Sequence, residues 1–124
     1  MDAARAWVEA WELCWRTHDV KPIVARYAEG AVFRSHPFRE AEEPQAYVER
    51  VLAEEDAEPE VWFGEPIVDD GRAAVEYWAI LRVEGKEQTL AGTTLLRFDA
   101  DGLVVEHRDY WALEPGRRGR PAAS

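Results

Sequence analysis

The spacing of apolar residues changes near position 60 of the chain. Before this point, apolar residues recur every three or four positions, which is the period of a helix with one buried face. Residues 2–17 show the pattern most clearly, because Trp7, Trp11 and Trp15 fall on one stripe. After it, apolar and polar residues alternate singly, as they do in strands. The pattern therefore predicts helices first and a meander of strands afterwards.

The first half also contains signals for two more helices and one strand. Asp19 is positioned to cap a short second helix, which has Tyr27 on its buried side and ends at Gly30. Residues 31–36 are predicted to form a strand. Pro44 begins a third helix, whose apolar residues again have helical spacing.

The second half consists of long alternating segments. Three turn signals separate them: Asp69–Gly71, Glu84–Lys86 and Asp99–Gly102. Helices followed by hairpin-connected strands predict an α+β fold, in which the helices pack on one face of a curved antiparallel sheet. Residues 1–113 are expected to form this single domain. The basic residues 114–124 are expected to be a flexible tail.

The inward face of the last three strands depends on the turns that join them. We assume two-residue loops, Gly85-Lys86 and Ala100-Asp101. The inward set then includes Leu103, Val105, Trp111 and two rows of neighbouring residues: Tyr77, Thr94 and His107, and Ala79, Gly92 and Asp109. Because Ala79 and Gly92 have the smallest side chains, a hollow is expected above Asp109.

The opposite face of these strands also carries large apolar side chains: Trp78, Ile80, Leu95, Val104 and Tyr110. An apolar sheet face usually meets a partner, and the simplest partner is a second copy of the chain. A homodimer through this face is therefore expected.

Charge narrows the range of partners. The formal net charge of -10 makes the average surface field repel nucleic-acid backbones and anionic membranes, so neither is expected as a partner. The acidic run from Glu54 to Glu60 is expected to be a solvated loop. The single cysteine, Cys14, cannot form an internal disulfide. No apolar stretch of the sequence has membrane-spanning length, and a cytoplasmic location is expected.

Two stretches of the chain resemble a known superfamily. They are YAEGAVFRSHPF at Tyr27 to Phe38 and LLRFDADGLVVEHRDYW at Leu95 to Trp111, and they follow the tryptophan-rich first helix. Together they resemble the nuclear transport factor 2-like superfamily, in particular its SnoaL-like branch. The resemblance covers nearly the whole chain and implies a cone of three helices on a strongly bent sheet, with an internal pocket at the open end.

The same resemblance implies a range of activities. Members include ketosteroid isomerases, polyketide cyclases, dehydratases and epoxide hydrolases, and in several of them an aspartate on the final strand is a general base or acid. Asp109 matches that aspartate in the RDYW motif. The residues Thr93, Thr94 and Leu95 stand where epoxide hydrolases carry an arginine and an aspartate, and the first helix lacks the tyrosine of the isomerases. These two activities are therefore not predicted.

Three functions are consistent with these features. The first is a cofactor-independent lyase, isomerase or cyclase, in which Asp109 moves a proton, His107 assists, and Tyr77 or Thr94 steadies a developing oxyanion. A small apolar, oxygen-bearing substrate would contact residues of the pocket wall and mouth: Trp11, Trp15, Phe33, His36 and Trp111. The alternatives are a non-catalytic ligand-binding or sensing domain and a protein-interaction module. The spacing of His36, His107 and Asp109 lacks the paired pattern of metal sites, so no metal is expected.

Overall fold

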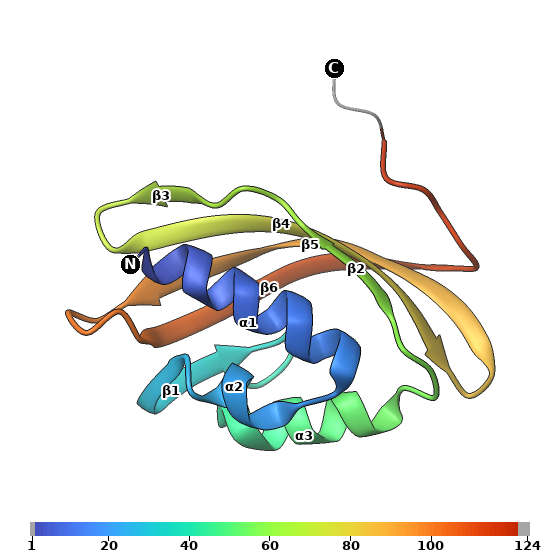
Figure 1. Cartoon of the computed structure of the whole chain (residues 1–124), viewed down its shortest axis with the longest axis horizontal. Coiled ribbons are helices and arrows are strands. Elements are labelled where there is room, and N and C mark those ends of the chain that lie inside the picture. The colour runs from blue at the N-terminus through green and yellow to red at the C-terminus, as the bar shows by residue number, and fades with distance from the viewer. Residues whose placement is uncertain (1, 122–124) are drawn as a thin grey trace.

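The computed structural model describes residues 2–121, which form three helices and a six-stranded sheet. The helices are α1 (Ala3–Thr17), α2 (Val20–Val24) and α3 (Pro44–Glu54). The strands are β1 (Tyr27–Arg34), β2 (Glu60–Phe63), β3 (Ile67–Asp69), β4 (Arg72–Val83), β5 (Lys86–Phe98) and β6 (Val104–Pro115). The sheet arches over the helices, as Figure 1 shows, and the predicted α+β fold is confirmed.

Local signals in the sequence set the ends of the two longer helices. The Asp2 carboxylate accepts a hydrogen bond from the Ala4 N–H and caps α1. At α3, the Glu43 carboxylate accepts hydrogen bonds from two N–H groups of the first turn. Pro44 occupies the first helical position, where an N–H would have no partner within the helix, so the missing N–H of proline costs nothing. In residues 2–121, no helix combines the length and apolar character needed to cross a bilayer.

The second helix is shorter than predicted. It ends at Val24, and Tyr27 belongs to β1 and not to the helix. Gly30 has a φ of 77° and lies where the pairing of β1 with β6 is irregular, so it accommodates a bulge and does not end a helix. The prediction of a helix up to Gly30, and of a strand that starts at residue 31, was therefore wrong.

The sheet is mixed, although an antiparallel sheet was predicted. Its order is β1-β6-β5-β4-β2, with β3 paired to β4, and β1 runs parallel to β6. Parallel strands need a long connection, and here α3 and four strands separate the pair in the sequence. This pairing sets Phe33 beside His107 at the centre of the molecule.

The turn between β4 and β5 differs by one residue from the prediction. Its loop is Glu84-Gly85, whose φ angles of 52° and 76° are those of a type I′ turn. Pairing is therefore Val83 with Lys86, and Tyr77 lies opposite Gly92 and not opposite Thr94. The shift moves every partner by two positions, so the inward face of β4 is unchanged.

The turn between β5 and β6 has a three-residue loop, Ala100 to Gly102, closed by hydrogen bonds between Asp99 and Leu103. A loop one residue longer than predicted moves the side chains at the start of β6 to the opposite face of the sheet. Val104 is therefore completely buried, whereas Val105 is only partly buried. A bulge opposite Arg97 and Phe98 then restores the predicted faces. From His107 onward the inward residues are those that were predicted.

The predicted rows of neighbours on the inner face were wrong. Thr94 pairs with Asp109, and Gly92 pairs with Trp111. A Cβ at Gly92 would lie 2.5 Å from the Tyr110 carbonyl oxygen and 2.6 Å from the Trp111 Cβ. The glycine thus makes room for the backbone and side chain of β6 near Trp111, and not for a hollow above Asp109.

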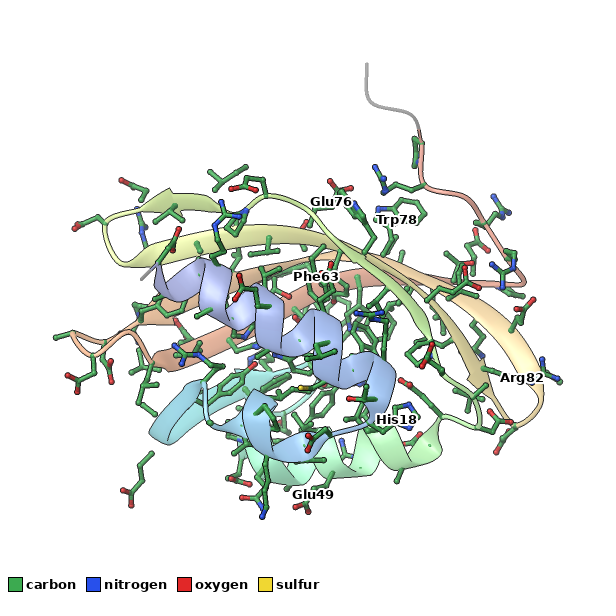
Figure 2. All side chains as sticks on the ribbon, in the orientation of Figure 1. His18, Glu49, Phe63, Glu76, Trp78 and Arg82 are labelled. Carbon is green, nitrogen blue, oxygen red and sulfur yellow. The ribbon has the colours of Figure 1, made fainter. Side chains whose placement is uncertain are left out.

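The outer face of the sheet differs from its prediction in one residue. Glu76 and Trp78 project from this face, whereas Phe63 points toward α1 (Figure 2). Trp78, Ile80 and Leu95 are half-buried and Tyr110 is 43% exposed. Val104 was assigned to this face but lies in the core, for the reason given above.

The described part of the C-terminal tail lies along the edge of this outer face. The Arg117 guanidinium donates to Glu60 and Glu87 at 2.6 and 2.9 Å, and the Arg120 guanidinium lies 3.8 Å from the Trp62 ring centre. These partners are solvent-exposed, so each ion pair contributes little to stability. The flexibility expected for the tail stays a prediction.

Replacing Gly92 by alanine is expected to lower the free energy of unfolding by about 1–3 kcal/mol, because the new methyl group meets backbone atoms that cannot move aside. Urea denaturation measures the effect. Gly119→Ala is the matched control, since nothing lies within 4 Å of its Cβ position. Equal stability of the two variants would contradict the close approach at Gly92.

The homodimer through the outer face stays a prediction. We expect light scattering at micromolar concentration to give twice the mass of one chain, and Tyr110→Glu to give a monomer because it places a charge on the apolar surface. A monomeric mass for the parent protein would contradict the dimer.

Candidate functional site

A cavity of about 490 Å³ lies between the helices and the inner face of the sheet. Its wall includes eight of the nine residues that the sequence singled out: Trp11, Trp15, Phe33, Tyr77, Thr94, His107, Asp109 and Trp111. The ninth, His36, is not part of the wall and packs against Trp111 with ring centroids 4.7 Å apart. A cavity of this size is within the range of small-molecule sites.

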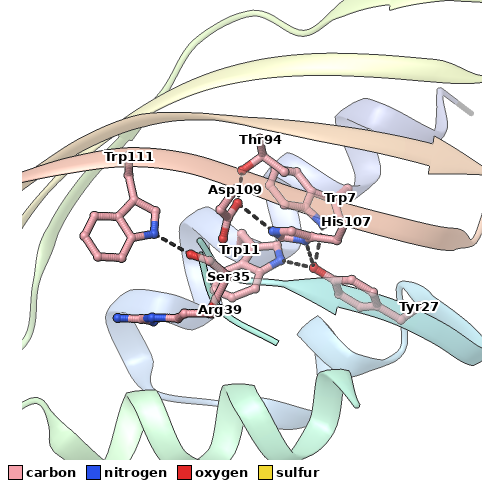
Figure 3. A network of polar contacts seen from close by, with 9 residues as sticks. All are labelled: Trp7, Trp11, Tyr27, Ser35, Arg39, Thr94, His107, Asp109 and Trp111. Atoms are coloured by element: carbon pink, nitrogen blue, oxygen red, sulfur yellow. Dashed lines mark hydrogen bonds and ion pairs between the residues drawn. The ribbon is translucent and has the colours of Figure 1, made fainter. Parts of the chain in front are cut away.

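Asp109 is the most connected polar residue of the wall. Its Oδ1 accepts a hydrogen bond from the Thr94 hydroxyl at 2.6 Å and lies 2.7 Å from His107 Nε2 (Figure 3). All three side chains are buried, and β5 and β6 hold them side by side. Among the described residues, none donates a hydrogen bond to the second carboxylate oxygen, Oδ2.

The other ring nitrogen of His107 meets the Tyr27 hydroxyl. The distance from Nδ1 to the hydroxyl oxygen is 2.7 Å, and this oxygen also accepts the indole N–H groups of Trp7 and Trp11 at 3.0 and 3.1 Å. Phe33 stacks on the His107 ring at 3.7 Å, which holds the imidazole plane. Three elements, α1, β1 and β6, therefore converge on one hydroxyl group (Figure 3).

The positions of the protons in this network follow from counting donors and acceptors. Both lone pairs of the Tyr27 oxygen are taken by the two indoles, so its own proton must point to His107 Nδ1. Burial raises the pKa of the Tyr27 phenol well above its ordinary value, which keeps that proton in place. Since Nδ1 accepts, Nε2 carries the ring proton and donates it to Asp109.

This arrangement directs the chemistry of Asp109 to one oxygen. Oδ1 is occupied by two donors, so a proton exchanged with a bound molecule goes to Oδ2. The neutral His107 is fixed in one tautomer and orients the carboxylate, as the carboxylate partner orients histidine in catalytic triads. Thr94 gives its proton to Asp109 and therefore positions the carboxylate instead of binding a ligand oxyanion.

Two further phenols line the cavity, those of Tyr47 and Tyr77. Burial, and then the nearby charge of Asp109, raise the pKa of each above its ordinary value. Both hydroxyl groups therefore remain protonated at neutral pH and are able to donate to a ligand oxygen.

A basic residue lies at the rim near Asp109. Arg39 donates to the Ser35 hydroxyl at 3.1 Å, and its guanidinium lies 5.2 Å from the Trp111 ring centre. Trp111 donates its indole N–H to the Ser35 carbonyl oxygen, which fixes the indole beside the cavity (Figure 3). Arg39 is exposed and also lines the cavity, as do Arg50, Glu54 and Leu113, so the cavity is open to solvent along a rim that includes Arg39.

A second carboxyl group lines the cavity from the end of α3. Glu55 was predicted to lie in a solvated loop, but its side chain is 2% exposed. It accepts the Trp15 indole N–H at 2.9 Å and lies 3.0 Å from His18 Nε2. Its backbone bridges to Val83 of β4, which turns the side chain inward and explains the wrong prediction. Burial raises the pKa of this carboxyl.

Sequence reasoning missed Tyr27, Tyr47 and Glu55. Tyr27 was assigned to a helix, so its place beside His107 was not considered. Tyr47 recurs with the apolar residues of the third helix at helical spacing, which indicates a residue of the hydrophobic core and not of a site. Glu55 stands inside an acidic run with nothing to distinguish it from its neighbours. In residues 2–121, no three His, Cys, Asp or Glu side chains gather closely enough to hold a metal ion.

Comparison with known families supports the resemblance seen in the sequence. The model of the SnoaL-like domain matches residues 4–107. No curated protein sequence is significantly similar to the chain.

Several solved structures share the fold. RV0760c from Mycobacterium tuberculosis has a TM-score of 0.78 at 17% identity, and the match covers 94% of this chain and 98% of that one. The epoxide hydrolase/cyclase-like enzyme SalBIII of pyran ring formation in salinomycin has a TM-score of 0.77 at 14% identity, with 90% and 95% covered. A Delta 5-3-ketosteroid isomerase from Mycobacterium sp. has 0.75 at 15% identity, with 94% and 100% covered.

Removing the Tyr27 hydroxyl is expected to destabilise the protein. Tyr27→Phe leaves two buried indole N–H groups and His107 Nδ1 without a partner, and we expect a loss of about 1–3 kcal/mol in urea denaturation. Tyr110→Phe is the control, because the Tyr110 side chain lies on the exposed face. If both variants are as stable as the parent, the Tyr27 hydroxyl does not hold the network together.

Proposed function

The chain belongs to the family of SnoaL-like domains, and we propose that it is a cofactor-independent enzyme of the lyase, isomerase or cyclase kind. Its substrate is a small, mostly apolar molecule that carries a carbonyl or hydroxyl oxygen. The observation that supports this proposal is the carboxylate of Asp109, which is buried in the cavity wall with Oδ1 held by two donors and Oδ2 without one. A buried base fixed in one orientation is suited to proton transfer.

In the proposed reaction, Asp109 Oδ2 takes a proton from a carbon next to a carbonyl group. The electron pair of the C–H bond forms a C=C bond, and the π pair of the carbonyl moves to its oxygen. The hydroxyl of Tyr47 or Tyr77 donates a hydrogen bond to this oxyanion. In a substrate whose acidic carbon also adjoins a C=C bond, the oxyanion pair then re-forms the carbonyl and the enolate π pair moves to the bond between the acidic carbon and that C=C. The π pair of the original C=C bond takes the proton from Oδ2 at its far carbon, which restores the carboxylate.

The indole wall sets the substrate class. Trp11 and Trp15 lie edge to face with ring centroids 5.8 Å apart, and both line the cavity with Phe33 and Phe63. Aromatic walls bind flat or ring-shaped apolar molecules through dispersion and burial of apolar surface. The named activities of SalBIII and the ketosteroid isomerase, each on a fold like this one, are of the same general kind.

The second candidate is a non-catalytic domain that binds or senses a ligand. The completeness of the network favours it, because every polar atom from Trp7 to Asp109 Oδ1 has a partner without any ligand. Such a network also serves as a structural link between α1 and the sheet.

Proton abstraction is tested with 4-phenylcyclohexanone in D₂O, by following the mass of the ketone as its α-protons exchange. We expect the protein to catalyse the exchange and Asp109→Asn to reduce the rate at least about 100-fold, because the amide cannot act as a base. Asp101→Asn is the matched control, since Asp101 is exposed in the turn between β5 and β6 and does not line the cavity.

Binding is measured in parallel by quenching of tryptophan fluorescence. Equal affinity for the ketone in the parent and Asp109→Asn, with no exchange in either, would reject the enzyme and leave the binding domain. Exchange that survives in Asp109→Asn would reject Asp109 as the base.

A further inference from the structure

Glu55 is the one buried carboxyl of the cavity wall that the proposed reaction does not use. It caps the end of α3, and backbone contacts on both sides of it tie the chain to β4: the bridge to Val83 and the hydrogen bond from Asp56 N–H to the Arg82 carbonyl. These contacts fix the direction of the side chain. Its burial is therefore imposed by the fold.

The position of Glu55 relative to Asp109 follows from the indole wall. Trp11 lies 6.5 Å from the His107 ring and 5.8 Å from the Trp15 ring, between ring centroids. His107 contacts Asp109, and the Trp15 indole N–H donates to Glu55. The two carboxyl groups thus lie at opposite ends of a wall two indoles long.

The Glu55 carboxylate can accept more hydrogen bonds than the protein supplies to it. An ionised carboxylate accepts about four hydrogen bonds. Oε2 receives one from Trp15, and Oε1 faces one ring nitrogen of His18, so two sites remain. His18 lies at the end of α1 beside α3 (Figure 2), and 30% of its side chain is exposed, against 2% for Glu55. The charged or titratable groups that act on Glu55 are His18 and the exposed Glu54.

We infer that Glu55 is a second ligand-binding group of this cavity, which accepts a hydrogen bond from a hydroxyl group at the far end of an elongated substrate. The inference rests on the proposed function, in which the carbonyl end lies at Asp109. The substrate is then a molecule with an apolar middle, an enolisable carbonyl at one end and a hydroxyl at the other. A carboxylate accepts from a hydroxyl and repels a carbonyl oxygen, so it also sets the orientation in which the substrate is bound.

Two compounds of the same skeleton test this inference: 4-(4-hydroxyphenyl)cyclohexanone and 4-phenylcyclohexanone. They share the ketone and differ only in the hydroxyl at the far end. The parent protein is expected to bind the hydroxylated compound at least about tenfold more tightly, as for a hydrogen bond to a charged group. In Glu55→Gln we expect this advantage to fall to within about threefold, because the acceptor has lost its charge.

Two controls separate binding from structure. Glu58→Gln makes the same change at an exposed residue of the same acidic run that does not line the cavity, and is expected to keep the advantage. His18→Gln removes the other partner of Glu55 at a residue that does not line the cavity, retains the carboxyl, and is also expected to keep the advantage. Circular dichroism checks the fold of each variant. If Glu55→Gln does not fold, Glu55→Asp shortens the side chain without changing its charge, and the advantage is expected to fall in the same way.

An equal advantage in the parent and in the Glu55 variants, or none in the parent, would overturn the inference and leave Glu55 as a structural acceptor for Trp15. In that case, loss of ketone exchange in Asp109→Asn still supports the proposed function. If instead the advantage depends on Glu55 while no protein catalyses exchange, the binding group stands and the enzyme is rejected.

Discussion

The hydroxyl group of Tyr27 is the point on which the site depends. One oxygen atom joins α1, through Trp7 and Trp11, to β6, through His107. Because its two lone pairs and its proton are all used, it fixes both the distance of the helix from the sheet and the tautomer of the imidazole. A buried network in which every group has a partner specifies a single arrangement, whereas a missing partner would leave several buried donors unsatisfied.

The two carboxyl groups of the cavity have opposite surroundings. Asp109 receives a hydroxyl and an imidazole donor on one oxygen, and its histidine partner is 2% exposed. The histidine partner of Glu55 is 30% exposed, and burial is the largest influence on the Glu55 carboxyl, whose pKa it raises. The two carboxyls therefore differ in what they offer a ligand: Asp109 has Oδ2 free to exchange a proton, whereas Glu55 is held as an acceptor between Trp15 and His18.

The inward faces of the strands were predictable from alternation alone, and the partners were not. Alternation places His107, Asp109 and Trp111 inward. The three-residue loop before β6 would reverse these faces, but a β-bulge restores them, and no sequence pattern indicates this bulge. The pairing of Thr94 with Asp109 depends on that loop and that bulge together, so it could not be derived. Tyr27 and Glu55 acquire their roles from partners 80 and 37–40 residues away in the chain, through contacts that no local pattern encodes.

The sealed network also restricts the kind of reaction that Asp109 can serve. Tyr27 cannot pass a proton onward, because its oxygen already accepts two indole N–H groups, which have no other acceptor within residues 2–121. A proton taken by Oδ2 therefore leaves only through the cavity, either back to the bound molecule or out across the exposed rim. Reactions that return the proton to the substrate, such as isomerisation or ring closure, need no further path. An elimination meets the same condition when the proton goes to the departing hydroxyl group and leaves with it as water, so this geometry disfavours only reactions that must send the proton through Tyr27.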